Sequence, residues 1–101
     1  IMSIQITSGA SPQDVLITGR IDTLTAGEFE EQLLPLITPE TPSITLNCSG
    51  VDYISSSGLR VFILADKKSQ EYNGTITIVG LNDFLKDIFD VSGLTGFFTF
   101  D

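Results

Sequence analysis

Three consecutive serines, Ser55, Ser56 and Ser57, are the residues whose type and spacing could support chemistry in this chain. They follow residues 44–48, where apolar and polar side chains alternate with the period of two that is typical of a strand with one buried face. They precede residues 59–68, which contain no Gly or Pro and many good helix formers. The serines are therefore predicted to stand where a strand ends and a helix begins.

A helix start favours a hydroxyl or an anion, because its first N–H groups have no partner inside the helix and its dipole end is positive. Two interpretations follow. One serine could simply be the N-cap, which is worth about 1 kcal/mol. Alternatively, one serine could accept a phosphate, because a phosphoserine is tolerated at a helix N-terminus and adds about −1.5 to −2 of charge. Spacing alone favours the cap.

Catalysis by these serines lacks a partner base. The chain has no histidine, which excludes a Ser-His-Asp arrangement, and Lys67 and Lys68 are predicted to lie two to three helical turns away. Metal-binding spacings and nucleotide-binding glycine motifs do not occur in the sequence either. We therefore expect no enzyme, no metal site and no cofactor, but a binding module.

The charge balance restricts the partners. Thirteen acidic residues against five basic ones give a net charge of −8, which disfavours nucleic acid and anionic membrane surfaces. With 101 residues and 42% hydrophobic content, we expect one domain spanning residues 1–101 and a core without disulfides. The single cysteine, Cys48, is predicted to be buried. Neither a signal segment nor a membrane-spanning stretch is apparent, so cytoplasm is the expected location.

The first half of the chain predicts a hairpin and a helix. Residues 4–7 and 14–19 alternate as strands around the turn chemistry of residues 9–12. Thr25 and Glu28 match a capping box, and an apolar helical stripe follows it. Pro35 should kink or end that helix. The stripe consists of Phe29, Leu33, Leu36 and Ile37.

The second half predicts a strand at 43–48, a helix at about 57–72, a strand at 75–79 and a helix capped by Asn82. The third helix is predicted to place four apolar residues on one face, Phe84, Leu85, Ile88 and Phe89, and to end at Gly93. A short strand or extended tail follows at residues 97–100. Because several strands alternate apolar with polar residues, we expect an α/β fold with a mixed four- to five-stranded sheet and helices packed mainly on one face.

Two segments carry a family resemblance: DYISSSGLR at residues 52–60 and GRIDTLTA at residues 19–26. They resemble the STAS domain of bacterial anti-sigma factor antagonists, and the resemblance covers nearly the whole chain and implies the STAS fold. In that family the phosphorylated serine stands two residues before the Gly-Leu pair, which is Ser56 here. The best-known members have Asp at the position of Ser55, and Ser57 is the competing acceptor.

The resemblance also implies a function. The unphosphorylated protein would bind an anti-sigma factor serine kinase and release a sigma factor, the kinase would inactivate it by phosphorylating Ser56 with its own ATP, and a PP2C-type phosphatase would restore it. Partner contacts are expected from Ser55, Ser56, Ser57, Gly58 and Arg60, and from Asp22 and Thr23 in the other family-like segment. Arg60 could pair with a phosphate or with Asp52, although most surface ion pairs contribute little. The alternatives are a steric role for Gly58 and loop capping for Asp22 and Thr23.

A different class of function remains open. The chain could be a STAS domain without a phosphorylation cycle, either a constitutive scaffold or a small subunit of a larger assembly such as a lipid-transport complex. Its partner binding would then be independent of the state of Ser56.

Overall fold

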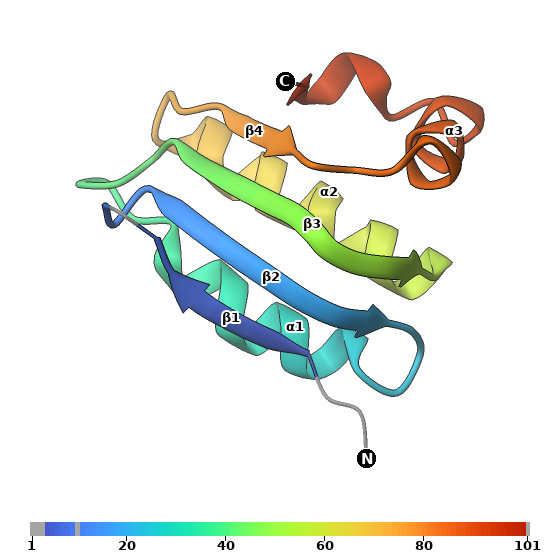
Figure 1. Cartoon of the computed structure of the whole chain (residues 1–101). Coiled ribbons are helices and arrows are strands. Elements are labelled where there is room, and N and C mark those ends of the chain that lie inside the picture. The colour runs from blue at the N-terminus through green and yellow to red at the C-terminus, as the bar shows by residue number, and fades with distance from the viewer. Residues whose placement is uncertain (1–3, 10, 101) are drawn as a thin grey trace.

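The structure is a computed structural model that describes residues 4–9 and 11–100. Five strands form one sheet in the order β1-β2-β3-β4-β5, with only the β1–β2 pair antiparallel (Figure 1). The strands are β1 (Gln5–Ser8), β2 (Asp14–Ile21), β3 (Ile44–Ile54), β4 (Ile76–Val79) and β5 (Thr99–Phe100). The mixed sheet expected from the sequence is confirmed. The sequence expectations at residues 1–3 and 10 lie outside the described residues.

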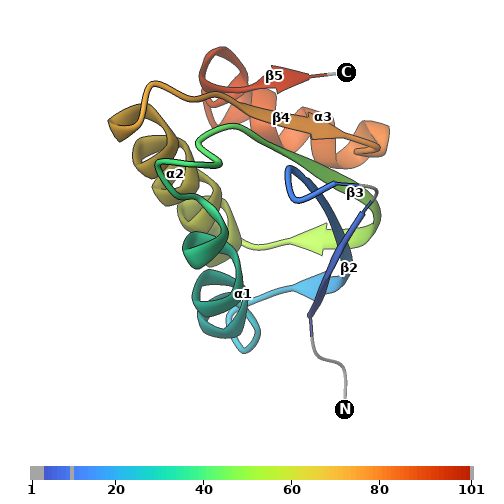
Figure 2. The same cartoon turned by 90° about the vertical axis from the view of Figure 1, so that its left-hand side faces the viewer.

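The helices are α1 (Ala26–Leu33), α2 (Ser56–Glu71) and α3 (Asp83–Val91), with 3₁₀ turns η1 (Leu34–Leu36) and η2 (Thr95–Phe97). Viewed along the sheet, α1 and α2 lie side by side on one face of the strands (Figure 2). As predicted, α1 ends just before Pro35, where the ring removes a backbone donor and the chain continues as a 3₁₀ turn.

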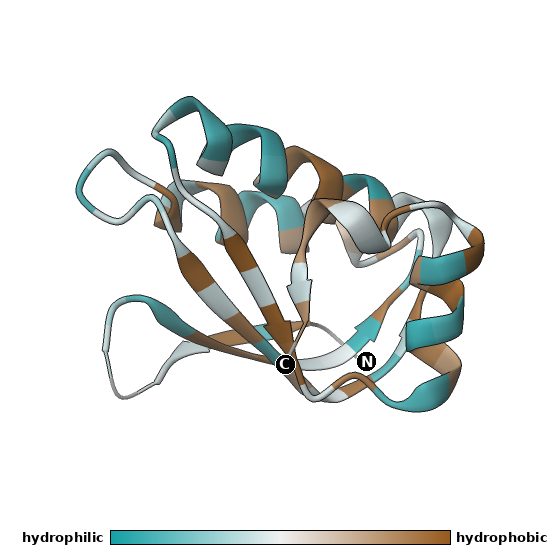
Figure 3. Cartoon of the chain, turned by 90° about the horizontal axis from the view of Figure 1, so that it is seen from above, coloured by the Kyte–Doolittle hydropathy of each residue, from teal (hydrophilic) through white to brown (hydrophobic). Residues whose placement is uncertain are grey.

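One face of the sheet is buried and the other is not. In β3 and β4 the inward side chains Ile44, Leu46, Ile76 and Ile78 are at most 1% exposed, whereas their neighbours along each strand are half-buried. A matching alternation of hydrophobic residues, in brown, with residues of intermediate hydropathy, in white, is visible along the strands in Figure 3. Because apolar residues recur every second position on one side only, helices are needed on that side alone.

Aromatic rings join the three helices in one core. Phe62 of α2 lies 5.3 Å from Phe29 of α1 and 5.4 Å from Phe89 of α3, measured between ring centroids. Phe89 in turn contacts Phe98 and Phe100 near the C-terminus, at 5.8 and 5.7 Å. Most of these pairs meet edge to face, the arrangement that the ring quadrupole favours. The C-terminal aromatic residues therefore belong mainly to the core edge.

Three local predictions are wrong. The third strand does not end at Cys48 but continues to Ile54, because Gly50 lets the chain stay paired where a Cβ would lie 2.6 Å from Cγ2 of Thr18. Thr25 makes no capping hydrogen bond to α1, because its hydroxyl accepts the N–H of Asp22 and donates to the carbonyl of Arg20 instead. Phe84 is not on the buried face of α3 but is 61% exposed.

Candidate partner-binding and phosphorylation site

The two family-like segments meet at one edge of the sheet. Ile21 and Ile54, the last residues of the parallel strands β2 and β3, are paired, and the N–H of Ser55 donates to the carbonyl of Ile21 at 2.7 Å. Because parallel strands end at the same edge, the turns that follow them leave the sheet side by side (Figure 1). Residues more than thirty positions apart in the sequence therefore share one surface.

The three serines occupy different environments. Ser55 is the N-cap of α2: its Oγ accepts the N–H of Gly58 at 3.1 Å, and the residue is 9% exposed. Ser56, the first residue of the helix, is exposed, and Ser57 is half-buried. The cap and the accessible hydroxyl are thus separate residues. Since Ser and Asp are both favoured caps, Ser55 keeps the cap that an Asp would provide while placing no charge beside Ser56.

Gly58 fits a tight contact inside the molecule. A Cβ at this position would lie 2.5 Å from Cγ2 of Ile21 and 3.0 Å from Cγ2 of Ile54. The start of α2 therefore approaches the ends of β2 and β3 more closely than any side chain allows. The steric role is sufficient to explain this glycine.

Asp22 organises the neighbouring turn from within. Its Oδ1 accepts the N–H groups of Leu24 and Thr25 at 2.9 and 3.0 Å, and its Oδ2 accepts Nε of Arg20 at 3.2 Å. Desolvation raises the pKa of this carboxyl, but the hydrogen bonds, led by those from Leu24 and Thr25, outweigh it, so the pKa is lowered overall. Loop capping is therefore an observed role of Asp22.

Leu24 is a surface residue that sequence reasoning missed. The turn that Asp22 holds directs Leu24 outward, where it is 90% exposed, and Thr23 beside it is also exposed. An exposed apolar side chain on a turn fixed by hydrogen bonds is a suitable protein contact. The available signal was a leucine inside a polar turn that fits no strand or helix period.

The two arginines near this edge make contacts within the chain. The guanidinium of Arg20 lies 4.1 Å from the ring centroid of Tyr53, a cation–π contact, and also bonds Asp22. Nη1 of Arg60 lies 3.3 Å from Oε1 of Glu30, so Arg60 joins α2 to α1. The pairing of Arg60 with Asp52 that the sequence allowed is not formed. The pair of Arg60 with Glu30 is exposed and contributes little to stability.

The arrangement presents an exposed hydroxyl, that of Ser56, at the start of α2. Lys68 is not beside the serines, because its Nζ donates to the carbonyl of Leu34 at 2.7 Å. The N–H groups of Ser56 and Ser57 have no acceptor among the residues described here. These free donors and the dipole of a 16-residue helix favour an anion at this end.

Within the described ranges, none of the helices has both the length and the apolar character needed to cross a membrane.

Comparison with known proteins gives consistent results. A family model described as "Mlab, STAS domain" matches residues 4–99. A protein named "Anti-sigma-B factor antagonist" from Staphylococcus aureus is 29% identical over 93 residues, covering 92% of this chain and 86% of its own length. Its namesake from Staphylococcus epidermidis is 30% identical over 81 residues, covering 80% of this chain and 75% of its own length.

Solved structures share the fold at low sequence identity. The anti-sigma factor antagonist SpoIIAA in its unphosphorylated form superposes with a TM-score of 0.77 at 16% identity, covering 97% of this chain and 87% of that one. The phosphorylated Bacillus SpoIIAA gives a TM-score of 0.70 at 16% identity, with 97% and 90% covered. A STAS domain protein from Planctomyces limnophilus gives 0.81 at 14% identity, with 100% and 90% covered.

Proposed function

Because this chain belongs to the STAS domain family, together with bacterial anti-sigma factor antagonists, we propose that it controls a sigma factor through a phosphorylation switch at Ser56. In this proposal the unphosphorylated protein binds an anti-sigma factor that is also a serine kinase, and this binding releases the sigma factor. The cycle would take place in the cytoplasm, where transcription occurs.

The exposed position of Ser56 is the observation that carries the proposal. It stands at the first position of α2 between a buried N-cap and a half-buried serine, so its hydroxyl is the most accessible of the three. The turn with Thr23 and Leu24 leaves the sheet beside it. Together they form a contact surface with a modifiable hydroxyl within it, and we assign partner binding to these residues and to Ser57 and Arg60.

The chemistry of the switch is supplied by the partner. Oγ of Ser56 attacks the γ-phosphorus of the kinase's ATP, the bond from that phosphorus to the bridging oxygen breaks, ADP leaves, and a base of the kinase takes the serine proton. A PP2C-type phosphatase then hydrolyses the phosphoserine to serine and inorganic phosphate. The protein is the substrate in both steps and needs no cofactor of its own.

The phosphate would act at the interface and leave the fold unchanged. The free N–H groups of Ser56 and Ser57 and the helix dipole can accommodate the anion, so the domain need not rearrange. A partner that lacks a matching cation would have to desolvate a dianion. Mismatching one buried charge at an interface costs about 2–5 kcal/mol, which weakens affinity by about 30-fold or more.

The test compares Ser56→Asp with Ser56→Ala in binding to the anti-sigma factor of the source organism, measured by calorimetry. We expect the alanine variant to bind like the wild type and the aspartate variant to bind about 30-fold more weakly or worse. Ser49→Asp, at an exposed serine of β3 before this edge, is the matched charge control. Equal affinities of both Ser56 variants would refute the switch.

Mapping of phosphate on the native protein identifies the acceptor. Intact mass and peptide fragmentation of protein from growing and stressed cells should find one phosphate on Ser56 that changes with condition. A phosphate on Ser57 would keep the function and correct the site.

A second candidate is favoured by the family model, whose description names Mlab. It is a constitutive STAS subunit of a larger assembly, in which the same surface binds a fixed partner. A protein that carries no phosphate in any condition and co-purifies with a partner regardless of Ser56 would establish this candidate in place of the sigma factor cycle.

A further inference from the structure

Asp66, in the middle of α2, is a buried carboxylate that the proposed switch does not use. The residue is 5% exposed, and its Oδ2 accepts Nε2 of Gln70 at 2.9 Å. Among the described residues, no lysine or arginine lies within ion-pair distance of it. In the part of the chain that the structure describes, no fully buried side-chain oxygen lacks a partner, so Oδ1 of Asp66, for which no hydrogen bond is found there, keeps some access to solvent. A carboxylate that is mostly removed from water is costly unless a cation or several donors compensate it. The side chain is therefore only partly compensated by the chain itself.

Asp66 lines a cavity of about 280 Å³ between α2 and the segment that contains η2. The walls are largely apolar: Leu94 is buried and Phe97 is 55% exposed. The complete lining is Ile63, Asp66, Lys67, Gln70, Leu94 and Phe97. The cavity thus combines one buried negative group with apolar walls and an exposed aromatic ring.

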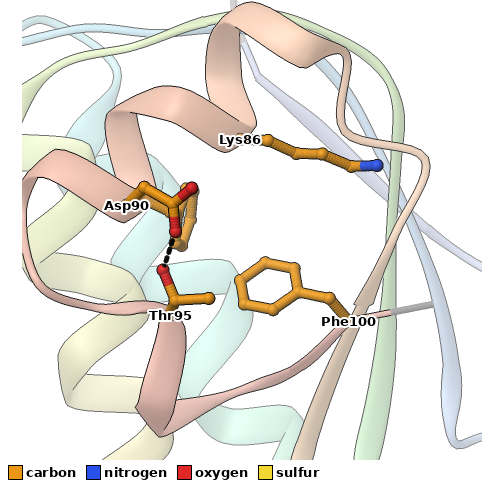
Figure 4. Close-up of a pocket in the computed structure, with 5 residues that line it drawn as sticks. Lys86, Asp90, Thr95 and Phe100 are labelled. Carbon is orange, nitrogen blue, oxygen red and sulfur yellow. Dashed lines mark hydrogen bonds between the residues drawn. The ribbon is translucent and has the colours of Figure 1, made fainter.

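A second hollow, lined by other residues of the C-terminal segment, differs from the cavity at Asp66 in the exposure of its acidic group. It measures about 190 Å³ and lies between α3 and β5, where Asp90 accepts the hydroxyl of Thr95 (Figure 4). Asp90 is exposed, and Lys86 lines the same hollow. The acidic group of this hollow is thus exposed to solvent, whereas Asp66 is buried.

We propose that the cavity at Asp66 binds an arginine side chain of a partner protein. A guanidinium offers paired donors for the carboxylate, its aliphatic stem suits the apolar walls, and its planar face can stack on Phe97. Lys67 does not supply this cation, because it is exposed and makes no ion pair with Asp66. A chain of net charge −8 selects basic partners, and arginine is enriched at the centres of protein interfaces.

This site is separate from the switch. Asp66 follows Ser56 by ten residues, which corresponds to about 15 Å along a helix axis. A phosphate at Ser56 and an arginine at Asp66 would therefore bind different parts of a partner, or different partners. The failure of one proposal leaves the other unaffected.

The test titrates ¹⁵N-labelled full-length protein with N-acetyl-arginine amide, followed by amide shifts of the cavity residues. We expect saturable shifts centred on Asp66 and Phe97. Asp66→Asn, which keeps the size and the contact with Gln70, should weaken binding by about tenfold or more. Lys67→Gln should strengthen binding about twofold, because it removes a like charge from the rim.

Two controls separate recognition from general charge attraction. Glu71→Gln removes one exposed acid from the same helix and should leave the affinity unchanged. N-acetyl-citrulline amide, the neutral isostere, should not bind. The proposal is overturned by equal binding of citrulline, by equal losses in Asp66→Asn and Glu71→Gln, or by the absence of saturable shifts up to the solubility limit of the arginine compound. Urea unfolding of Asp66→Asn verifies that the variant folds.

Discussion

The turns before α1 and α2 both connect the end of a parallel strand to the start of a helix, but they differ in length and in hydrogen bonding. Both follow parallel strands that end together, at Ile21 and Ile54. The turn into α2 is a single residue, Ser55, whose side chain caps the helix directly. The turn into α1 runs from Asp22 to Thr25, and its side chains bond within the turn and back to Arg20 at the end of β2, not to the helix start.

In both turns, the residues that fix the backbone are different from the residues that are exposed at the surface. The short turn buries its cap and leaves the next residue, Ser56, exposed at the helix start. The long turn uses a buried threonine and a half-buried aspartate to hold two exposed residues, Thr23 and Leu24. Residues that fix each turn should therefore affect folding, and residues that it exposes should affect binding.

The largest effect is expected from Gly58→Ala, which tests how closely α2 approaches the strands. Since the added Cβ would lie 2.5 Å from Ile21, we expect a loss of about 1–3 kcal/mol in the free energy of unfolding, measured in urea. Gly27→Ala in α1 is the matched control, because a Cβ there meets nothing within 4 Å and should stabilise by about 0.5–1 kcal/mol. Equal changes in both variants would contradict the tight contact.

Ser55→Ala comes next, because it removes the cap of α2 and leaves the N–H of Gly58 without its acceptor. We expect a loss of about 1–2 kcal/mol in the free energy of unfolding. Ser57→Ala should change it by less than about 0.5 kcal/mol, and Ser55→Asp should retain most of the stability. A larger loss of unfolding free energy in Ser57→Ala than in Ser55→Ala would show that Ser55 is not the N-cap of α2.

Asp22→Asn tests the long turn through pH. The lowered pKa of Asp22 means that its contribution to stability is complete above the unfolded-state pKa, about 3.9, and is lost as the pH falls through the folded-state value. The difference in unfolding free energy between wild type and Asp22→Asn should therefore shrink on acidification from about pH 7 to about pH 3. A difference that is constant over this range would show that the charge of Asp22 does not contribute.

The smallest effect on stability is expected from Leu24→Ala. Because the side chain is 90% exposed, the free energy of unfolding should change by less than about 0.5 kcal/mol. Binding to the proposed anti-sigma factor should nevertheless weaken, by calorimetry, by about fivefold or more if Leu24 is an interface anchor. Urea unfolding measures the stability of the variant. An affinity equal to that of the wild type would show that Leu24 does not belong to the proposed partner-binding surface.

Much of the fold could be predicted because local patterns and global packing agree. The order of strands and helices, the end of α1 before Pro35 and the cap of α3 by Asn82 follow from periodicity and backbone chemistry, and all are present. Burial of Cys48 was also predicted, and desolvation raises the pKa of its thiol to about 12. The C-terminal end of β3 could not be predicted from the sequence, because the pairing of Gly50 with Thr18 depends on β2, a strand distant in sequence.

The sequence by itself determined that three serines stand at a helix start, that no histidine can activate them and that the chain is strongly acidic. These properties depend on residue type and local spacing. Only the tertiary structure decided which serine is the buried cap and which is exposed, that Leu24 lies beside them, and that Asp66 is buried without a basic partner in the described part of the chain. Burial and proximity depend on how β2, β3 and the helices pack, and helical or strand periodicity carries no information about contacts between distant elements.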